Sequence, residues 1–213
     1  MGQVKKPRVR GAILAAALRL FSKKGYTRTT LAQIARKADV STANLYVYFR
    51  SKLEILYAIY DPWLRARFVD LERRMSRARS PEAKLRLLLK TLWRDLPAEK
   101  HGFVNNIMQA ISSATPADRY KPALLKWMEE HLERMLQSAL PAPRRRALAQ
   151  ARLAHLLVMA FDGFIIHHHV NPRAPLGDAT IDTVCAMLLG RALQRPSKKS
   201  TIAAPRISSP VLK

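Results

Sequence analysis

The chain has little cysteine, few acidic residues and no long apolar run, and each of these shortages excludes a class of protein. Its one cysteine, Cys185, cannot form an internal disulfide, so a reducing, cytoplasmic location is expected. No stretch approaches ~20 uninterrupted apolar residues, so we expect no membrane-spanning helix and no membrane partner. Residues 11–20 are interrupted by Arg19 and continue into a helical pattern, so we expect no signal sequence.

Motifs that carry enzyme chemistry are also missing. The sequence holds no glycine-rich phosphate loop, nucleophile elbow or paired-cysteine motif, so we expect neither an enzyme nor a cofactor. His167, His168 and His169 suggest a metal site, but successive helical side chains point about 100° apart and cannot all meet one ion. Imidazoles near a helix C-terminus explain them better, and a metal-dependent hydrolase is kept as the weakest alternative.

Positive charge dominates what is present. The 213 residues include 38 Lys and Arg against 15 Asp and Glu, which gives a net charge of +23. The natural partners of such a chain are acidic polymers, with nucleic acid first and an anionic membrane surface second. Residues 1–52 contain twelve basic residues and one acid, Asp39, so the N-terminal part has a strong positive field that attracts phosphates.

Two short helices joined by a tight turn are predicted within this basic region. Thr30 and Gln33 form a capping-box pattern, which starts a helix directly after the threonine. Asp39 tolerates the left-handed backbone that a turn needs, and Ser41 can cap a second helix that ends near Phe49. Such a helix pair commonly presents side chains to the major groove of DNA. The plainer alternative is a small packed unit with a solvated basic face.

Side chains on the outer surface of this unit are the candidates for DNA contact. Asn44 suits paired hydrogen bonds with adenine, whereas Lys52 and the helix start at Thr30 are expected to hold phosphates. The full set of predicted DNA-contacting residues is Thr30, Gln33, Ser41, Thr42, Ala43, Asn44, Tyr46, Tyr48 and Lys52.

The same stretch carries a family resemblance. Residues 34–54, IARKADVSTANLYVYFRSKLE, resemble the TetR-family DNA-binding signature, a string of the type IAxxAGVSxGxLYxYFxSKxxL. Asp39 and Ala43 stand where the family usually has glycine, and the added methyl of Ala43 bears on which bases fit. The resemblance covers the N-terminal region alone. It implies a homodimer that binds a double-stranded DNA operator and releases it when a small molecule occupies a helical C-terminal domain.

Beyond Lys52 the sequence predicts long helices of mixed charge and no strands. A capping box at Ser51 and Glu54 opens a helix that reaches about residue 78. Further helices are expected at 82–96, 102–113, 115–140 and 144–170, with a hinge at 141–143 and a final helix capped by Asp178 or Thr180. The prediction is an all-α chain of about nine helices.

This reading divides the chain into three parts. Residues 1–52 form the predicted helix-turn-helix DNA-binding domain, with a basic arm at 1–8. Residues 53–194 form a helical ligand-binding and dimerisation domain, and residues 195–213 form a disordered basic tail.

A mostly apolar pocket with a few polar groups is the expected effector site of the C-terminal domain. The plainer interpretation of the same residues is ordinary helical core. The candidate lining is Trp93, His101, Phe103, Asn106, Met108, Gln109, Trp127, Phe161 and Asp162. Because few of these residues are charged, we expect an apolar or aromatic effector.

A homodimer is expected to form through the last two long helices, because their apolar faces exceed what one helical layer can bury. The predicted interface consists of Leu153, Leu156, Leu157, Ala160, Gly163, Phe164, Val184 and Leu188. The overall prediction is a cytoplasmic, ligand-responsive repressor of a palindromic operator. Its rival is a sequence-indifferent basic DNA-binding or architectural protein.

Overall fold

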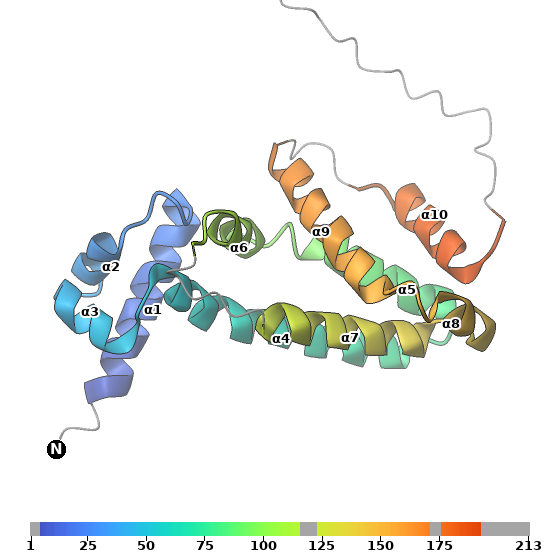
Figure 1. Ribbon diagram of the computed structural model, residues 1–213, viewed down its shortest axis with the longest axis horizontal. Coiled ribbons are helices and arrows are strands. Elements are labelled where there is room, and N and C mark those ends of the chain that lie inside the picture. The colour runs from blue at the N-terminus through green and yellow to red at the C-terminus, as the bar shows by residue number, and fades with distance from the viewer. Residues whose placement is uncertain (1–4, 116–122, 171–175, 193–213) are drawn as a thin grey trace, which may run out of the picture.

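The computed structural model describes residues 5–115, 123–170 and 176–192, and within these ranges the regular structure is entirely helical (Figure 1). The all-α prediction is confirmed, with ten α-helices against about nine expected. The predicted tail at 195–213, the first part of the helix predicted at 115–140 and residues 171–175 lie outside the described residues. The helices are α1 (Lys5–Lys24), α2 (Leu31–Lys37), α3 (Thr42–Tyr48), α4 (Lys52–Arg77), α5 (Pro81–Lys90), α6 (Phe103–Ser112), α7 (Ala123–Ala139), α8 (Ala142–Leu148), α9 (Leu153–Val170) and α10 (Asp178–Leu189).

Helices α1, α2 and α3 form a small unit at one end of the molecule (Figure 1). Their shared core includes Ile13, Ile34 and Leu45, all fully buried. α1 begins at Lys5, so the second half of the basic arm predicted at 1–8 is in fact its first turn. α1 ends at Lys24, where Gly25 adopts a left-handed backbone (φ 80°) and its amide donates to Phe21 O at 2.9 Å.

The long helix α4 belongs to both parts of the chain. Its first turns pack on α1, and its later turns pack on α5, α6 and α7. Leu56, Leu64 and Phe68 are essentially inaccessible to solvent along this face. The cap at its start differs from the predicted box: Ser51 Oγ accepts from the Glu54 amide at 3.1 Å, but Glu54 Oε2 accepts from the Arg50 amide at 2.7 Å.

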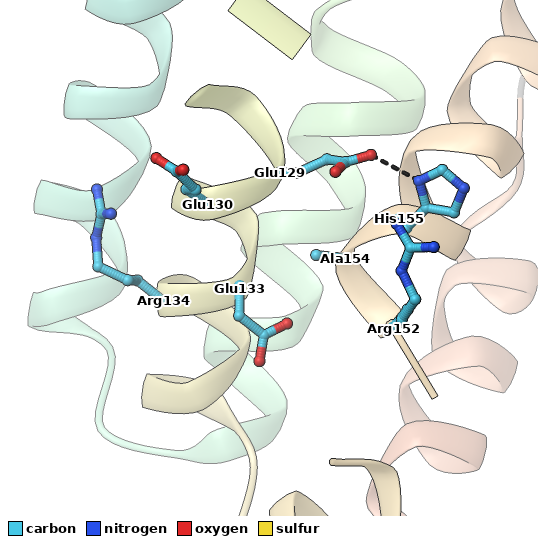
Figure 2. A pocket seen from close by; sticks show the side chains of 7 residues that line it. All are labelled: Glu129, Glu130, Glu133, Arg134, Arg152, Ala154 and His155. Carbon is cyan, nitrogen blue, oxygen red and sulfur yellow. Dashed lines mark hydrogen bonds and ion pairs between the residues drawn. The ribbon is translucent and has the colours of Figure 1, made fainter. Parts of the chain in front are cut away.

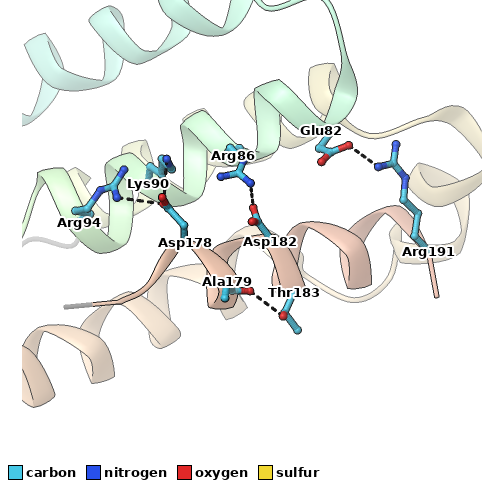
Figure 3. Close-up of polar contacts among 9 residues, drawn as sticks. All are labelled: Glu82, Arg86, Lys90, Arg94, Asp178, Ala179, Asp182, Thr183 and Arg191. Atoms are coloured by element: carbon cyan, nitrogen blue, oxygen red, sulfur yellow. Dashed lines mark hydrogen bonds and ion pairs between the residues drawn. The ribbon is translucent and has the colours of Figure 1, made fainter. Parts of the chain in front are cut away.

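The C-terminal body is built around α5, which packs against α4, α7 and α10. A π-helical turn, Thr91–Asp95, follows α5 directly and carries the chain toward α6. α7 and α6 in turn support α9. Ion pairs between α5 and α10 reinforce the packing of these two helices (Figure 3). These pairs are Arg86 with Asp182, Lys90 and Arg94 with Asp178, and Glu82 with Arg191 just beyond α10.

The region expected to be one helix at 144–170 is two. The predicted hinge at 141–143 is the start of α8, because Pro141 is its N-cap and helices tolerate proline in the first turn. The chain then breaks between Leu148 and Leu153, where Arg152 adopts a left-handed backbone with φ 45°. No glycine or proline marks this break in the sequence, so periodicity alone carried the prediction through it.

The last helix also differs in its ends. Gly177 precedes α10 and no side chain caps it, so neither Asp178 nor Thr180 is the N-cap. α10 ends at Leu189, and the left-handed Gly190 (φ 70°) follows it. The guanidinium of Arg144 donates to Leu188 O and Met187 O, both at 2.9 Å, and so satisfies two carbonyls at the helix end.

Candidate functional site

Local hydrogen bonds fix the orientation of α2 and α3. Thr30 Oγ1 accepts from the Gln33 amide at 3.2 Å and Gln33 Oε1 accepts from the Thr30 amide at 3.3 Å, which confirms the predicted capping box. Asp39 has φ 56° in the turn, a conformation that asparagine and aspartate tolerate better than most residues. Ser41 Oγ then accepts from the Asn44 amide at 3.1 Å and begins α3. The helix-turn-helix is thus specified by short-range contacts.

One face of α3 is exposed while the other is anchored in the core. Leu45 of α3 is fully buried, and Phe49, the residue that follows α3, is 2% exposed. The predicted contact residues Ser41, Thr42, Ala43, Asn44 and Tyr46 are exposed, whereas Tyr48 is only partly exposed. Val47, which was not among the candidates, is 76% exposed. In helix-turn-helix proteins, the N-terminal residues of such an exposed helix contact base edges in the major groove.

Lys52 has a different environment from the one expected. Its ammonium donates to Tyr26 O and Thr29 O, both at 2.9 Å, and lies 4.1 Å from the centre of the Tyr26 ring. It therefore ties the start of α4 to the turn that precedes α2. These contacts give Lys52 a role in supporting the unit.

Positive charge surrounds α3 with little opposing acid. In residues 7–52, exposed cations include Arg10, Arg28, Arg36, Lys37 and Arg50, and Asp39 is the single acid. Arg28 Nε donates to Lys24 O at 2.9 Å, which holds this cation near the end of α1. Such a field attracts the phosphate backbone irrespective of sequence, whereas the α3 face supplies groups able to read bases.

Three polar residues that were expected to orient a ligand instead bond to the N-terminal unit. Asn106 is 2% exposed, and its Nδ2 donates to Gly102 O at 3.0 Å and to Phe21 O at 3.3 Å. Gln109 Oε1 accepts from the amide and the hydroxyl of Thr27, both at 3.3 Å. His101 Nδ1 lies 3.4 Å from the Ser22 hydroxyl. α6 is therefore a second connection between the two parts of the chain.

The apolar candidates for the effector pocket separate into two clusters. Phe103 packs on Trp63, with ring centres 4.9 Å apart, and on Tyr60. Trp127 instead lies over His131 at 3.8 Å and near Phe68, with the Arg65 guanidinium 4.3 Å from its ring. Trp93 and Phe161 are buried, and Met108 is partly buried against the core.

A cavity of the C-terminal body lies away from these residues. It has a volume of about 460 Å³, opens widely to solvent, and lies between α7 and the first turns of α9 (Figure 2). Its lining is Glu129, Glu130, Glu133, Arg134, Arg152, Ala154 and His155, none of which was a candidate. His155 Nδ1 and Glu129 Oε1 lie 2.6 Å apart at its edge. None of the residues predicted to line the effector pocket lines this cavity.

Polar groups without partners occur inside the C-terminal body. The indole nitrogens of Trp63 and Trp93 and the hydroxyl of Thr91 are buried and have no hydrogen-bond partner among the described residues. Two of these residues belong to the π-helical turn, a feature that often marks functional positions. Burial raises the pKa of the Asp162 carboxyl, and burial together with the Asp162 charge raises the pKa of Tyr60. Unpaired polar atoms in an apolar interior are the groups a bound ligand would satisfy.

The predicted dimer residues do not all face outward. Leu157 and Leu188 are buried within the chain, at 5% and 9% exposure, whereas Leu156 is 53% exposed. Ala160 and Gly163 are exposed, and Leu153, Phe164 and Val184 are intermediate. Large exposed side chains that were not predicted continue the same surface. They are Met159, Ile166 and Val170 on α9 and Met187 on α10.

α9 also bears on the expectation that no helix could span a membrane. Leu153–Val170 has a mean hydropathy of 1.3 and is long and apolar enough to cross one by length and composition, with 28% of it buried inside the chain. The expectation counted uninterrupted apolar residues and so passed over this helix. An apolar helix so little buried needs a further apolar surface to cover it.

Comparison with known proteins agrees with the geometry of the N-terminal unit. A family model described as "Bacterial regulatory proteins, tetR family" matches residues 13–59. The transcriptional regulator HbdR of Aromatoleum sp. (strain CIB) is 52% identical over 48 residues, which are 22% of this chain and 21% of that protein. The chain covers between 21% and 30% of the lengths of the first curated relatives that it matches.

Solved structures resemble the chain over most of its length. The fatty acid degradation regulator FadR from Bacillus halodurans has a TM-score of 0.62 at 20% identity, covering 84% of this chain and 97% of that one. FadR from Bacillus subtilis in complex with stearoyl-CoA has a TM-score of 0.59 at 16% identity, with 85% and 98% covered. AibR in complex with isovaleryl coenzyme A and operator DNA has a TM-score of 0.55 at 20% identity, with 86% and 100% covered. These likenesses concern the fold.

The fold and the exposed α3 face define a helix-turn-helix protein with a helical C-terminal domain. The match to residues 13–59 and the named relatives show that its N-terminal region is similar to the DNA-binding region of TetR-family regulators.

The unpaired Asp162 carboxyl predicts an unusual pH dependence. Because burial raises its pKa in the folded chain, it binds its proton more tightly there than in the unfolded chain, so its contribution to stability falls as the pH rises through the carboxyl range. Asp162→Asn should therefore raise the melting temperature at neutral pH. The gain should vanish in acid, where the carboxyl is protonated in both states.

Thermal unfolding followed by circular dichroism across this pH range tests the prediction. Asp70→Asn is the matched control on the surface, because a hydrogen bond from Arg73 lowers the pKa of Asp70 and the substitution should reduce stability at neutral pH. A pH-independent effect of Asp162→Asn would show that this carboxyl is not the cause.

Proposed function

We propose that the protein is a transcriptional regulator of the repressor type, which binds a palindromic operator as a homodimer and is released by a small apolar effector. The observation that carries this proposal is the exposed face of α3 on a basic three-helix unit whose only acid in residues 7–52 is Asp39. The match of residues 13–59 to the tetR family model supports it, and AibR has been solved with operator DNA. Such a role would place the protein in the cytoplasm with the DNA it controls.

Base reading is assigned to the first turn of α3. Asn44 and Thr42 are exposed there, and an asparagine amide can form two hydrogen bonds with adenine N6 and N7. Tyr46 is 52% exposed one turn further on and offers both a ring and a hydroxyl. The caps at Thr30 and Ser41 present helix N-termini to the phosphates, which fixes the register of the helix on the duplex.

Replacement of Asn44 by alanine should separate specific from general binding. After the preferred sequence has been selected from random DNA, Asn44→Ala should cost about 1 to 3 kcal/mol on that site and much less on an unrelated duplex. Fluorescence anisotropy at several salt concentrations measures both. Gln150→Ala, an exposed amide in the α8–α9 connection, should change neither affinity. Equal losses on the two duplexes would remove Asn44 from base reading.

The exposed apolar surface of α9 and α10 is proposed as the dimer interface. Leu156, Met159, Ile166 and Val170 recur at helical spacing on one face of α9, and their exposures range from 53% to 79%. Gly163 lies on the same face, and a Cβ built there meets no atom within 4 Å in the single chain. A partner backbone can therefore approach closely at this point. A two-fold dimer would set the two α3 helices about 34 Å apart, which suits an inverted-repeat operator.

Two glutamates on this face should produce a folded monomer. Leu156→Glu with Ile166→Glu changes side chains that are 53% and 58% exposed, so the chain's own core is unaffected while a desolvated interface would contain unpaired charges. Sedimentation velocity should show the monomer, with operator affinity largely lost. Val69→Glu, at a 60% exposed position on α4, is the matched control and should remain dimeric. A double variant that sediments as a dimer would exclude this interface.

The effector is proposed to act on DNA binding through α4 and α6 together. α4 is common to both parts of the chain, and Asn106 and Gln109 bond α6 to residues of the N-terminal unit. The unpaired indoles of Trp63 and Trp93 can donate to an acceptor on an otherwise apolar ligand. Acyl thioesters, as held by the FadR and AibR structures, combine an apolar chain with such an acceptor. Binding would open space among these helices and displace α3 relative to its counterpart.

Linkage gives this mechanism a quantitative test. Effector and operator should weaken each other by the same factor, typically about 5- to 150-fold, since the coupling free energy is shared. Hits from a thermal-shift screen of apolar metabolites and acyl thioesters are titrated with and without operator. Gln109→Ala should reduce this factor, whereas Gln137→Ala on the far end of α7 should leave it unchanged. Hits that bind with the same affinity in the presence and absence of operator would contradict the coupling.

A further inference from the structure

Most basic residues at the end of the C-terminal body farthest from α3 lack an acidic partner, in contrast to those near α10. Along the α5–α10 contact, Arg86, Lys90 and Arg94 each face an aspartate (Figure 3). At the end of α4 and on α8 the pattern changes. Six arginines gather there, and we call them the distal basic surface: Arg73, Arg74, Arg77, Arg79, Arg145 and Arg146.

Few of these six charges have an acidic partner. Asp70 pairs with Arg73 at 2.5 Å and lies 3.9 Å from Arg74. The Arg145 guanidinium donates to a carbonyl, Gln137 O at 2.9 Å, which leaves its charge unopposed. Arg77, Arg79 and Arg146 are exposed, and their side chains make no ion pair or hydrogen bond with the described residues. The surface therefore retains most of its positive charge.

Several contacts bring the two segments of this surface to one end of the molecule. Residues 78–80 connect α4 to α5, and Lys84 in the first turns of α5 donates to Ser138 O at 3.2 Å near the end of α7. Arg145 of α8 bonds to the neighbouring Gln137. α8 accordingly lies at the end of the body opposite α1, α2 and α3 (Figure 1). The 26 residues of α4 separate the two ends by about 39 Å.

Positive charge also continues in the sequence beyond the described residues. Arg144 of α8 holds the carbonyls at the end of α10, so the described chain finishes beside the distal basic surface. The 19 residues at 195–213 attached beyond it include five Lys or Arg and no acid. Residues 1–52 hold twelve basic residues and one acid, so about half of the net charge of +23 is outside the N-terminal unit.

We infer that the distal basic surface binds the phosphate backbone of a second segment of double-stranded DNA, so that one molecule connects two duplexes. This inference rests on the proposed function, since it gives a DNA-binding protein a second DNA contact. A duplex held by α3 cannot also follow the opposite end of α4, about 39 Å away. Guanidinium groups match phosphate oxygens in a two-pronged geometry, and clustered arginines bind DNA without reading its sequence.

The composition of the surface favours nucleic acid over a membrane. Peripheral membrane binding combines basic residues with exposed large apolar side chains that enter the lipid. In the segments that carry the six arginines, Met75 is 2% exposed and Leu148 is partly buried. The surface thus offers charge without an apolar anchor.

The test measures capture of a second duplex by a molecule whose α3 site is already occupied. The full chain is bound to its selected operator on beads, with free operator removed, and a labelled duplex of unrelated sequence is then titrated. The wild type should capture it, with a steep loss of affinity as salt rises. Arg77→Gln with Arg79→Gln and Arg146→Gln should lower capture about tenfold or more and reduce the log–log salt slope by about 2 to 3, at roughly 0.9 per phosphate contact.

A charge-matched variant controls for the general loss of positive charge. Arg67→Gln with Lys100→Gln and Lys126→Gln removes the same number of charges at exposed positions outside the distal basic surface, and it should retain capture. Circular dichroism checks folding, and the pair Arg77→Gln with Arg146→Gln should give a smaller loss in the same direction. No capture by the wild type, or equal losses in both triple variants, would overturn the inference.

Further arms identify other outcomes. Stronger retention of duplex RNA or of anionic phospholipid vesicles than of DNA would overturn the inference in favour of that partner. Operator affinity is measured separately, and the distal variant should leave it within about twofold because it leaves the α3 contacts intact. If the wild type prefers no sequence, the proposed function fails, while capture of a second duplex still decides this inference.

Discussion

The packing of one face of α4 on two different sets of helices is the constraint on which the remaining structure depends. α1 covers its beginning, and α5, α6 and α7 cover the rest, so a single hydrophobic core runs through both parts of the chain. Lys52, in the first turn of α4, adds a polar contact because its ammonium donates to two carbonyls of the loop between α1 and α2. The recognition helix therefore cannot change its position without disturbing α4, α6, or the buried contacts between them.

Local and long-range interactions explain which features the sequence could predict. The caps at Thr30 and Ser41 connect residues three apart, so sequence spacing was sufficient to locate α2 and α3. The contacts of Asn106 with Phe21 and of Gln109 with Thr27 join residues more than 80 positions apart, and a mixed polar and apolar helix gave no sign of them. The same residues looked like pocket lining because both uses need polar groups on a mostly buried helix.

Periodicity was least informative where two helices meet without glycine or proline. The 144–170 pattern continues through a break that tertiary contacts impose, with Arg152 in a left-handed conformation. Likewise, a row of leucines could not indicate which side of α9 is covered by the chain itself. Leu157 faces inward and Leu156 outward, and this one-residue difference separates a core position from a surface available to a partner. The hydrophobic pattern therefore predicted where the last helices lie, but it did not distinguish the buried face of α9 from the exposed one.

Arg144 has a mechanical consequence. Its guanidinium donates to the last carbonyls of α10. A Cβ at Gly190 would lie 3.1 Å from the same side chain, so α8 and α10 are closely packed at this point. A force applied at α8 is therefore transmitted to α10, which ion pairs hold against α5 and the π-helical turn. If the two proposed DNA segments were held under tension, the force on the distal basic surface would therefore reach α10, part of the surface proposed as the dimer interface.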